Sequence, residues 1–450
     1  MIDKMKILLP QNVKTITDIL KNNGHEAFIV GGCVRDALMG INPHDWDICT
    51  SAKPEQVKEC FKDFNMFDSG IKHGTISIVI DKEVYEVTTY RIDGEYTDNR
   101  HPQNVTFTDD ITQDLARRDF TINAMAYNIE KGLVDPFKGQ DDLNNKIIRC
   151  VGNPDNRFNE DALRIIRALR FASTYGLSIE ENTSESILRN AHLLNNIAVE
   201  RIAVEFNKLV CGKGAEDILN NYRDVIAVFI PEIRKMFDFK QKTKHHNRDV
   251  WHHTTHSVSQ IENDALLRIT MLFHDLGKPD ACTYDADGST HFKGHPKYSA
   301  TKAETILRRL KYPTSFIENC LKLIIYHDVH FTGSKKQLKH VMSAVGEDNV
   351  RLLLKVQRAD KMAQSDYMHE EKLQKIDTAC KVFDEIIEEQ SCFTLKQLAV
   401  NGNDLKAIGI TEGKTIGKTL KYLLSLVIDE KIENDKSVLL MKAKDYLKGV

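Results

Sequence analysis

The sequence predicts an α+β fold in which one mixed domain is followed by an all-helical body. Short runs of β-forming residues alternate with Gly, Asn, Asp and Pro up to about residue 136. From about residue 158 the pattern changes, and apolar residues such as Leu163, Ile166 and Leu169 recur at helical spacing. A length of 450 residues is typical of about three domains.

The composition is that of an ordinary globular protein, with 41% hydrophobic and 28% charged residues. No run of about 18 apolar residues is present, so we expect no membrane span. The nine cysteines are scattered and include no C-x-x-C pair, which predicts reduced thiols in a cytoplasmic protein and neither disulfides nor a zinc site. A net charge of −3 argues against a generally basic nucleic-acid binder, so any RNA contact must be local.

The mixed domain is predicted to begin with an amphipathic helix. Val13, Ile16 and Leu20 are spaced as on one helix face within residues 11–23, and Asn23-Gly24 ends the pattern. Turn residues then separate several short β-like runs. We expect strands at Ala27 to Val30, Trp46 to Thr50, Thr75 to Ile80, Val84 to Tyr90 and Leu133-Val134.

A strand, a glycine turn and a helix are predicted over residues 28–36, in the sequence FIVGGCVRD. Glycines let the backbone approach a phosphate closely, and a helix N-terminus offers free N–H groups. Gly32, in the turn, and Arg35, one turn into the helix, are therefore candidates for phosphate contacts. An ordinary strand–helix turn is the competing interpretation.

Two carboxylates, Asp45 and Asp47, follow in a strand-like run. Alternate residues of a strand point to the same side, and paired carboxylates repel each other unless a cation lies between them. Hard oxygen ligands suit Mg²⁺, which activates an attacking hydroxyl and stabilises a leaving phosphate. Glu86 is the candidate for a third carboxylate, and solvated strand residues are the alternative.

Glu160 to Arg170 is predicted to form one helix, on which Asp161 and Arg164 share a face. A carboxylate accepts hydrogen bonds and a guanidinium donates them. Cytosine and adenine each present an amino donor beside a ring-nitrogen acceptor, so both complement this pair, whereas guanine and uracil would leave buried groups unpaired. The pair predicts selection of C and A without a nucleic acid template, and a surface salt bridge is the alternative.

The order of these motifs resembles the family of class II tRNA nucleotidyltransferases and bacterial poly(A) polymerases. The segments that carry the resemblance are GGCVRD, HDWD, EVTTYR, RRDFTINAMA and EDALRIIRALRF, within residues 25–175. It implies a DNA-polymerase-β-type head that adds C, C and A to the 3′ end of tRNA from CTP and ATP, releasing pyrophosphate. We accordingly expect a head at 1–136, a helical neck with the nucleotide-selecting helix at 137–238, an HD-type domain at 239–365 and an RNA-binding tail at 366–450.

The resemblance also implies roles for individual residues. It places Mg²⁺ at Asp45 and Asp47. It places Asp119 and Asn123, which lie near Arg118 in the sequence, beside the nucleotide. The residues that it places on the nucleotide come from three of the motifs: Gly32, Arg35, Arg118, Arg167 and Arg170.

A polar, glycine-containing stretch at 91–102 separates the third motif from the fourth. CCA-adding members of the family carry a flexible loop here that assists the switch to A addition, and members that add only CC tend to have a shortened one. The stretch therefore favours complete CCA addition. Poly(A) polymerase, and CC-only or A-only tRNA nucleotidyltransferase, stay open as alternatives.

A second set of residues follows the H…HD…D order of the HD phosphohydrolase superfamily: His253, His274, Asp275 and Asp360. Neutral imidazoles with carboxylates bind transition metals such as Mn²⁺, Ni²⁺ or Fe²⁺. We expect a second metal site able to hydrolyse a phosphate ester, with His295 and His327 where some superfamily members place extra ligands. A helical scaffold that keeps these residues as structural polar groups is the alternative.

Three classes of protein therefore compete: an RNA 3′-end nucleotidyltransferase, an HD phosphohydrolase with a decayed head, and a non-catalytic RNA-binding protein. Intact Asp45, Asp47, Asp161 and Arg164 argue against a decayed head. A non-catalytic protein has no use for paired metal carboxylates. The sequence predicts a Mg²⁺-dependent nucleotidyltransferase whose partners are tRNA, CTP and ATP.

Overall fold

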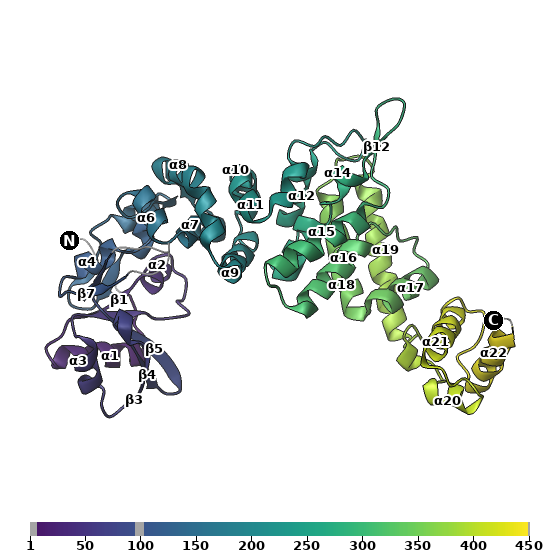
Figure 1. Ribbon diagram of the computed structural model, residues 1–450, viewed down its shortest axis with the longest axis horizontal. Coiled ribbons are helices and arrows are strands. Elements are labelled where there is room, and N and C mark those ends of the chain that lie inside the picture. Colours follow the sequence, from purple (N-terminus) through teal and green to yellow (C-terminus); the bar gives the residue numbers. More distant parts are fainter. Residues whose placement is uncertain (1–6, 95–102, 449–450) are drawn as a thin grey trace. The chain divides into compact units, whose positions relative to one another are not determined.

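A computed structural model describes residues 7–94 and 103–448 and groups the chain into two compact units, Met1–Pro231 and Glu232–Val450. The first unit holds a mixed sheet and the helices that follow it, and the second is largely helical (Figure 1). The predicted α+β fold is thereby confirmed. Most of the predicted loop at 91–102 lies outside the described residues, and the bounds of the four domains stay predictions.

A seven-stranded sheet forms the centre of the first unit. Its strands lie in the order β3-β4-β5-β2-β1-β8-β9, and neighbours are antiparallel except β2 and β5, which are parallel. The strands are β1 (Ala27–Val30), β2 (Ile48–Thr50), β3 (Asn65–Gly70), β4 (Thr75–Ile80), β5 (Glu83–Thr89), β8 (Ala126–Asn128) and β9 (Gly132–Val134). Two small pairs accompany them: β6 (Arg91–Asp93) with β7 (Val105–Phe107), and β10 (Ile147–Ile148) with β11 (Ser178–Ile179).

Helices pack on this sheet and then extend the unit. The first helix buries Val13, Ile16 and Leu20, the face that its spacing predicts, and the first and third helices contact the sheet. The helices are α1 (Gln11–Asn22), α2 (Gly32–Leu38), α3 (Pro54–Cys60), α4 (Ile111–Ala116), α5 (Gly139–Asn144), α6 (Pro154–Glu160), α7 (Leu163–Tyr175), α8 (Glu181–Asn190), α9 (Val199–Val210), α10 (Ala215–Asn221) and α11 (Arg223–Phe229). Short 3₁₀ turns lie at η1 (Ile71–His73), η2 (Thr121–Asn123), η3 (Ala191–Asn196) and η4 (Pro231–Met236).

The helix predicted from Glu160 to Arg170 is interrupted, so that prediction is wrong. Helix α6 ends at Glu160, and α7 begins at Leu163. Between them Asp161 has extended backbone angles, φ −138° and ψ 103°. Its carboxylate accepts a hydrogen bond from the Leu163 N–H at 3.1 Å, and aspartate competes in this way with continuous helix.

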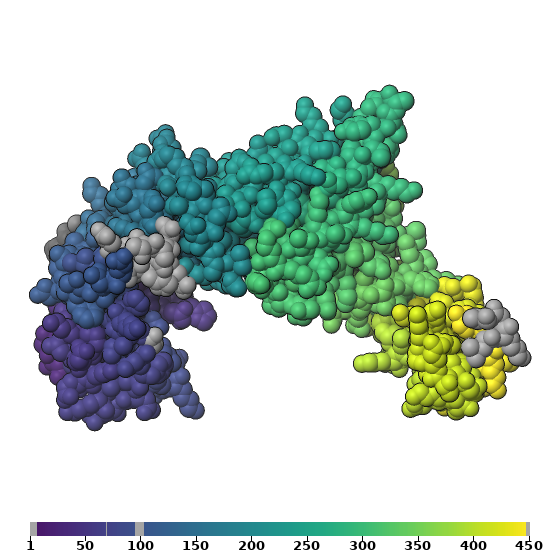
Figure 2. All heavy atoms as spheres, in the orientation of Figure 1, coloured from purple at the N-terminus to yellow at the C-terminus, as the bar shows by residue number. Residues whose placement is uncertain are grey.

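The second unit is a set of packed helices. Its helices are α12 (Val250–Ser259), α13 (Ala265–Phe273), α14 (Lys278–Ala281), α15 (His295–Arg309), α16 (Thr314–Tyr326), α17 (Lys335–Val345), α18 (Glu347–Met362), α19 (His369–Glu388), η5 (Leu395–Gln397), α20 (Gly402–Ala407), α21 (Gly413–Ile428) and α22 (Lys436–Lys448). A hairpin of β12 (Thr283–Tyr284) and β13 (Thr290–His291) projects from it (Figure 1, Figure 2). Among residues 7–94 and 103–448, no helix has the length and apolar character of a membrane span.

Candidate active site and metal centre

The glycine turn lies where the sequence predicts it, between the end of β1 at Val30 and the start of α2 at Gly32. Gly31 has a φ of 79°, in the left-handed region that favours glycine. A Cβ atom added at Gly31 would meet Nη1 of Arg118 at 2.8 Å. Glycine at this position therefore allows Arg118 to lie directly against the turn.

The two aspartates lie in the segment before β2, so the prediction that Asp45 and Asp47 lie within a strand is wrong. Strand β2 begins only at Ile48. Pro43 lacks the N–H that a strand ladder needs, and the backbone bends at His44 and Asp45. Both aspartates are exposed at the edge of the sheet, where β2 starts beside β5.

Glu86 completes a group of three carboxylates. It lies in β5 and directly precedes Val87, which pairs with Ile48 of β2. Desolvation raises the pKa of Glu86, and the charges of Asp47 and Asp45 raise it further. Desolvation likewise raises the pKa of Asp47, with Arg118 opposing and Asp45 adding to the rise. The three groups repel one another, which is the situation that a bound cation relieves.

Arg35 is buried and has a full set of partners. Its guanidinium donates hydrogen bonds to Asp36 at 2.8 and 2.9 Å, to the Tyr175 hydroxyl at 2.7 Å and to Oδ1 of Asn123 at 2.5 Å. It also lies 4.7 Å from the centre of the Tyr175 ring. Arg35 therefore ties α2 to α7 and must exchange a partner before it contacts a phosphate.

Asp119 and Asn123 continue this network. Oδ1 of Asp119 accepts hydrogen bonds from the Phe120 N–H at 2.8 Å and from Asn123 at 3.0 Å. Its Oδ2 accepts two from Arg167, at 2.6 and 3.0 Å. Burial alone would raise the pKa of Asp119, but the charge of Arg167 and the hydrogen bond from Asn123 hold that pKa well below its ordinary range.

Arg170 lies on α7 beside Arg167 and shares its acidic neighbour on α9, Glu205. Nε of Arg170 is 2.7 Å and Nη1 of Arg167 is 3.8 Å from the Glu205 carboxylate. Three guanidinium groups surround the ring of Phe171, at 3.8 Å for Arg170, 5.0 Å for Arg35 and 5.2 Å for Arg167. Arg35, Arg167 and Arg170 thus form one connected cluster with their counter-charges, whereas Arg118 pairs with Asp114 at 3.5 Å.

The two proposed base-reading residues are bonded to other partners. Arg164 donates to Glu160 at 2.6 Å and to two backbone carbonyl groups at 3.0 and 3.2 Å. Asp161 instead forms an ion pair with Arg201 of α9 at 3.3 Å. Nη1 of Arg201 is buried and has no hydrogen-bond partner within the described part of the chain.

Sequence reasoning missed Arg201 and Glu205, the two α9 residues that form ion pairs with Asp161 and Arg170. Glu205 is buried and lies on the same helix face as the buried Ile202 and Leu209. A charge on an apolar helix face requires a buried partner. This pattern was the available signal for Glu205, whereas the half-buried Arg201 offers none.

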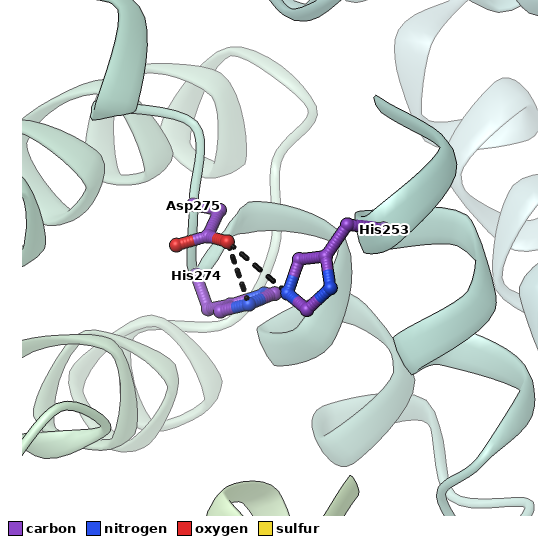
Figure 3. Close-up of side chains that lie close together, drawn as sticks. All are labelled: His253, His274 and Asp275. Atoms are coloured by element: carbon purple, nitrogen blue, oxygen red, sulfur yellow. Dashed lines mark ion pairs between the residues drawn. The ribbon is translucent and has the colours of Figure 1, made fainter. Parts of the chain in front are cut away.

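In the second unit, His253 of α12, His274 at the end of α13 and Asp275 point toward one another (Figure 3). Nε2 of His253 is 3.4 Å and Nε2 of His274 is 3.2 Å from Oδ2 of Asp275. Oδ1 of Asp360, from α18, is 3.0 Å from His253 and 3.7 Å from His274. All four residues are buried, and the structure brings the predicted set together.

Two further histidines approach the other oxygen of Asp275. Nε2 of His295 is 3.2 Å and Nε2 of His327 is 3.9 Å from Oδ1 of Asp275. The two imidazole nitrogens are 3.1 Å apart. Asp275 therefore lies between two histidine pairs, and each pair has the atoms of a metal-binding group with it.

The surroundings of these histidines fix their orientation. Each Nδ1 donates to a backbone carbonyl oxygen, so each Nε2 faces inward as a potential ligand atom. The acceptors are the carbonyl groups of Ala363, Met271, Phe292 and Ile324, for His253, His274, His295 and His327 in that order. Two lysines neutralise the acids, with Lys278 at 2.7 Å from Asp275 and Lys361 at 2.7 Å from Asp360. The cluster opens into a cavity of about 740 Å³.

Three segments of the chain match known domain families. Residues 27–149 match the poly A polymerase head domain, and residues 176–236 match the probable RNA and SrmB-binding site of polymerase A. Residues 290–443 match the putative domain 2 of tRNA nucleotidyltransferase.

Whole proteins are similar as well. The CCA-adding enzyme of Enterococcus faecalis is 32% identical over 440 residues, which is 97% of each chain. That of Oceanobacillus iheyensis is 50% identical over 198 residues, 44% of this chain and 49% of that protein. The crystal structure of the Bacillus stearothermophilus CCA-adding enzyme in complex with CTP has a TM-score of 0.72 at 27% identity, and the match covers 98% of this chain and 99% of that one.

Proposed function

This chain belongs to the family of CCA-adding enzymes, and we propose that Asp45, Asp47 and Glu86 carry out its nucleotidyl transfer. It is a CCA tRNA nucleotidyltransferase, which adds C, C and A from CTP and ATP to the 3′ end of tRNA and releases pyrophosphate. The observation that carries the assignment of the site is the mutual repulsion of the three carboxylates beside the glycine turn.

The donor set suits Mg²⁺, because carboxylate oxygens that raise one another's pKa gain most from a small divalent cation. Asp45 and Asp47 would hold it, and it would supply activation of the RNA 3′ hydroxyl and charge neutralisation on the triphosphate. We propose that Arg118, which lies against Gly31 and interacts with Asp47, binds the triphosphate. Gly32 leaves room for a phosphate, since among the described residues a Cβ there would approach only Arg35, at 3.6 Å.

Base choice falls to Asp161 and Arg164 in this proposal. The carboxylate accepts from the amino group of C or A, and the guanidinium donates to the adjacent ring nitrogen. Each must first exchange its present partner, Arg201 or Glu160, for the base. Arg167, Arg170 and Arg35 support this segment through the cluster around Phe171 and supply further positive charge toward the nucleotide.

The direct test supplies tRNA lacking its 3′ CCA with CTP alone, ATP alone, both, or GTP and UTP. We expect two C residues with CTP alone and the complete CCA with both nucleotides. Extension by a long A tract with ATP alone would identify a poly(A) polymerase instead. A product that stops at CC in the presence of ATP would identify a CC-only enzyme.

A second activity is favoured by one observation, the inward-facing Nε2 atoms on both sides of Asp275. We propose that His253, His274 and Asp360 hold one transition metal ion and His295 and His327 a second, with Asp275 shared between them. Mn²⁺, Ni²⁺ and Fe²⁺ suit imidazole and carboxylate donors. Such ions supply activated water for phosphate ester hydrolysis, in which the water oxygen bonds to phosphorus, the ester P–O bond breaks and the proton passes to the leaving alcohol.

We also propose bounds for the domains and a cellular setting for the protein. The matched segments at 27–149 and 176–236 support a head followed by a neck, for which we propose the bounds 1–136 and 137–238. The match at 290–443 lies within the rest of the chain, which we divide into an HD-type domain at 239–365 and an RNA-binding tail at 366–450. Nine cysteines, all free, support a reducing and hence cytoplasmic setting.

A further inference from the structure

The cavity beside the metal cluster has more lysines than acidic residues on its walls. Its acidic residues are Asp275, Asp328 and Asp360, of which the first and last belong to the cluster. Its lysines are Lys278, Lys293, Lys361, Lys372 and Lys375. Lys278 and Lys361 are paired with the cluster aspartates and Lys375 with Glu371, so the excess charge belongs to Lys293 and Lys372.

Lys372, in the first turn of α19, carries part of this excess positive charge. Its Nζ is shielded from solvent and has no hydrogen-bond partner within the described residues. The ammonium lies 6.0 Å from the centre of the Tyr367 ring, and the charge of Lys361 opposes it more strongly than the charge of Asp360 favours it. A shielded ammonium without an acceptor is costly, so the site gains from an anion.

Other basic groups converge on the same wall. His245, His330 and Lys361 all line the cavity with Lys372. Burial lowers the pKa of His245, and the charges of Lys372, Lys361 and His330 lower it further, which favours the neutral imidazole with its one N–H donor. The wall thus combines the charges of Lys361 and Lys372 with two histidines, contributed by α18, α19 and two loops around one cavity.

We propose that Lys372, Lys361, His245 and His330 form a subsite for a second phosphate group, so that the ligand of this cavity carries two phosphates. The inference rests on the proposed phosphohydrolase function for the first phosphate, which lies at the Asp275 cluster. A cavity of about 740 Å³ accommodates a ligand of nucleotide size. Two sources supply such a ligand: the end of a nucleic acid strand, with phosphates on both sides of a ribose, and a nucleoside diphosphate, with adjacent phosphates.

The test compares three probes by equilibrium dialysis against the full-length protein loaded with Mn²⁺, and chromatography after dialysis checks that each probe is intact. They are adenosine 3′,5′-bisphosphate, ADP and adenosine 3′-monophosphate. The variants are Lys372→Ala, the charge-retaining Lys372→Arg, and Lys381→Ala, an exposed lysine of the same helix that does not line the cavity. Nucleotide binding by the head is the same in all of them, so differences report on the cavity.

We expect Lys372→Ala to weaken binding of a two-phosphate probe by about tenfold, with the monophosphate changed by less than about twofold. Lys372→Arg should restore the affinity, and CCA addition should be unchanged in every variant. A loss confined to the 3′,5′-bisphosphate identifies a strand end, and a loss confined to ADP identifies a nucleoside diphosphate. Equal affinities in Lys372→Ala and Lys381→Ala for all probes overturn the subsite.

A parallel hydrolysis assay with added Mn²⁺ or Ni²⁺ separates the two proposals. If no probe is hydrolysed but the selective loss of affinity persists, the subsite stands and the phosphohydrolase function is wrong. If a phosphate ester is hydrolysed while Lys372→Ala binds all probes normally, the function stands and the subsite is wrong.

Discussion

Arg167 donates two hydrogen bonds to a single oxygen of Asp119, at 2.6 Å from Nη2 and 3.0 Å from Nε. The pair joins α7 to the segment after α4, and Asn123 extends it to Arg35. A chain of buried and half-buried polar groups thus connects the glycine turn with α7. Each group in this chain is oriented by the hydrogen bonds of its neighbours, and the charges of Arg167 and Asp119 compensate each other.

The first prediction concerns this pair and its dependence on pH. The pKa of Asp119 is lowered from its ordinary value of 3.8, so the ionised carboxylate stabilises the fold above that pH and the contribution is lost as pH falls below it. We expect Asp119→Asn to lower the free energy of unfolding at pH 7 by about 3 kcal/mol, because Arg167 keeps a charge without its counter-ion. Urea unfolding at several pH values measures the free energy of unfolding of the variant and of wild type.

The matched control is Glu185→Gln, which removes an exposed ion pair with Arg189 and should cost less than about 1 kcal/mol. The difference in the free energy of unfolding between wild type and Asp119→Asn should narrow below about pH 4, where the Asp119 carboxylate of the unfolded chain begins to take up its proton. A constant difference from pH 7 downward would contradict the assignment of the stabilisation to the ion pair.

The second prediction concerns the metal carboxylates. Asp45→Asn and Asp47→Asn should each reduce nucleotide addition by more than about a hundredfold, because the charge that holds Mg²⁺ is lost. The metal-free variants should unfold no more easily than wild type, since the raised pKa of Asp47 shows that its charge is unfavourable in the free protein. Mg²⁺ should raise the unfolding temperature of wild type and of the exposed-site control Asp63→Asn only. Near wild-type turnover with normal Mg²⁺ dependence in either variant would refute the site.

The parts of the fold that sequence reasoning found are those that local patterns determine. Strands β1 and β4, helix α1 and the glycine turn lie at the predicted residues. Strand β3, by contrast, has the sequence NMFDSG, whose polar residues are typical of turns. It forms a strand because it pairs with β4. Its presence depends on a neighbour, which no local pattern reports.

The same division applies to the candidate site. The residues around Asp275 could be predicted from the sequence, because their order resembles that of the HD phosphohydrolase superfamily. The ion-pair partners of Asp161 and Arg170 could not, since Arg201 and Glu205 lie on α9, about 40 residues further along the chain. Long-range ion pairs select their partners through packing, and packing is absent from a one-dimensional pattern.

The third prediction concerns base choice. Asp161→Ala and Arg164→Ala should each reduce the preference for C and A over G and U by about 5- to 100-fold, the effect of one unmatched buried polar group. Mg²⁺ dependence should be unaffected, because neither residue belongs to the carboxylate group. Single-nucleotide incorporation on tRNA lacking CCA, with each of the four triphosphates, measures the preference. Arg189→Ala, an exposed change on α8, is the control, and unchanged discrimination in both variants would rule out protein-templated selection.

The last prediction separates the two metal sites that we propose on either side of Asp275. Because its two oxygens face different histidine pairs, metal content should depend on which side is altered. We expect two transition metal ions in wild type, one in His253→Ala, one in His295→Ala and none in Asp275→Ala, as measured by elemental analysis after loading with Mn²⁺ or Ni²⁺. His252→Ala, the exposed neighbour on the same helix, should keep both ions. Combining His274→Ala with Asp275→Ala should abolish metal-dependent phosphohydrolysis and leave CCA addition intact, because the carboxylates of nucleotidyl transfer lie in the other unit. Absence of both metal and hydrolysis from a preparation that adds CCA would show that these histidines serve as a scaffold.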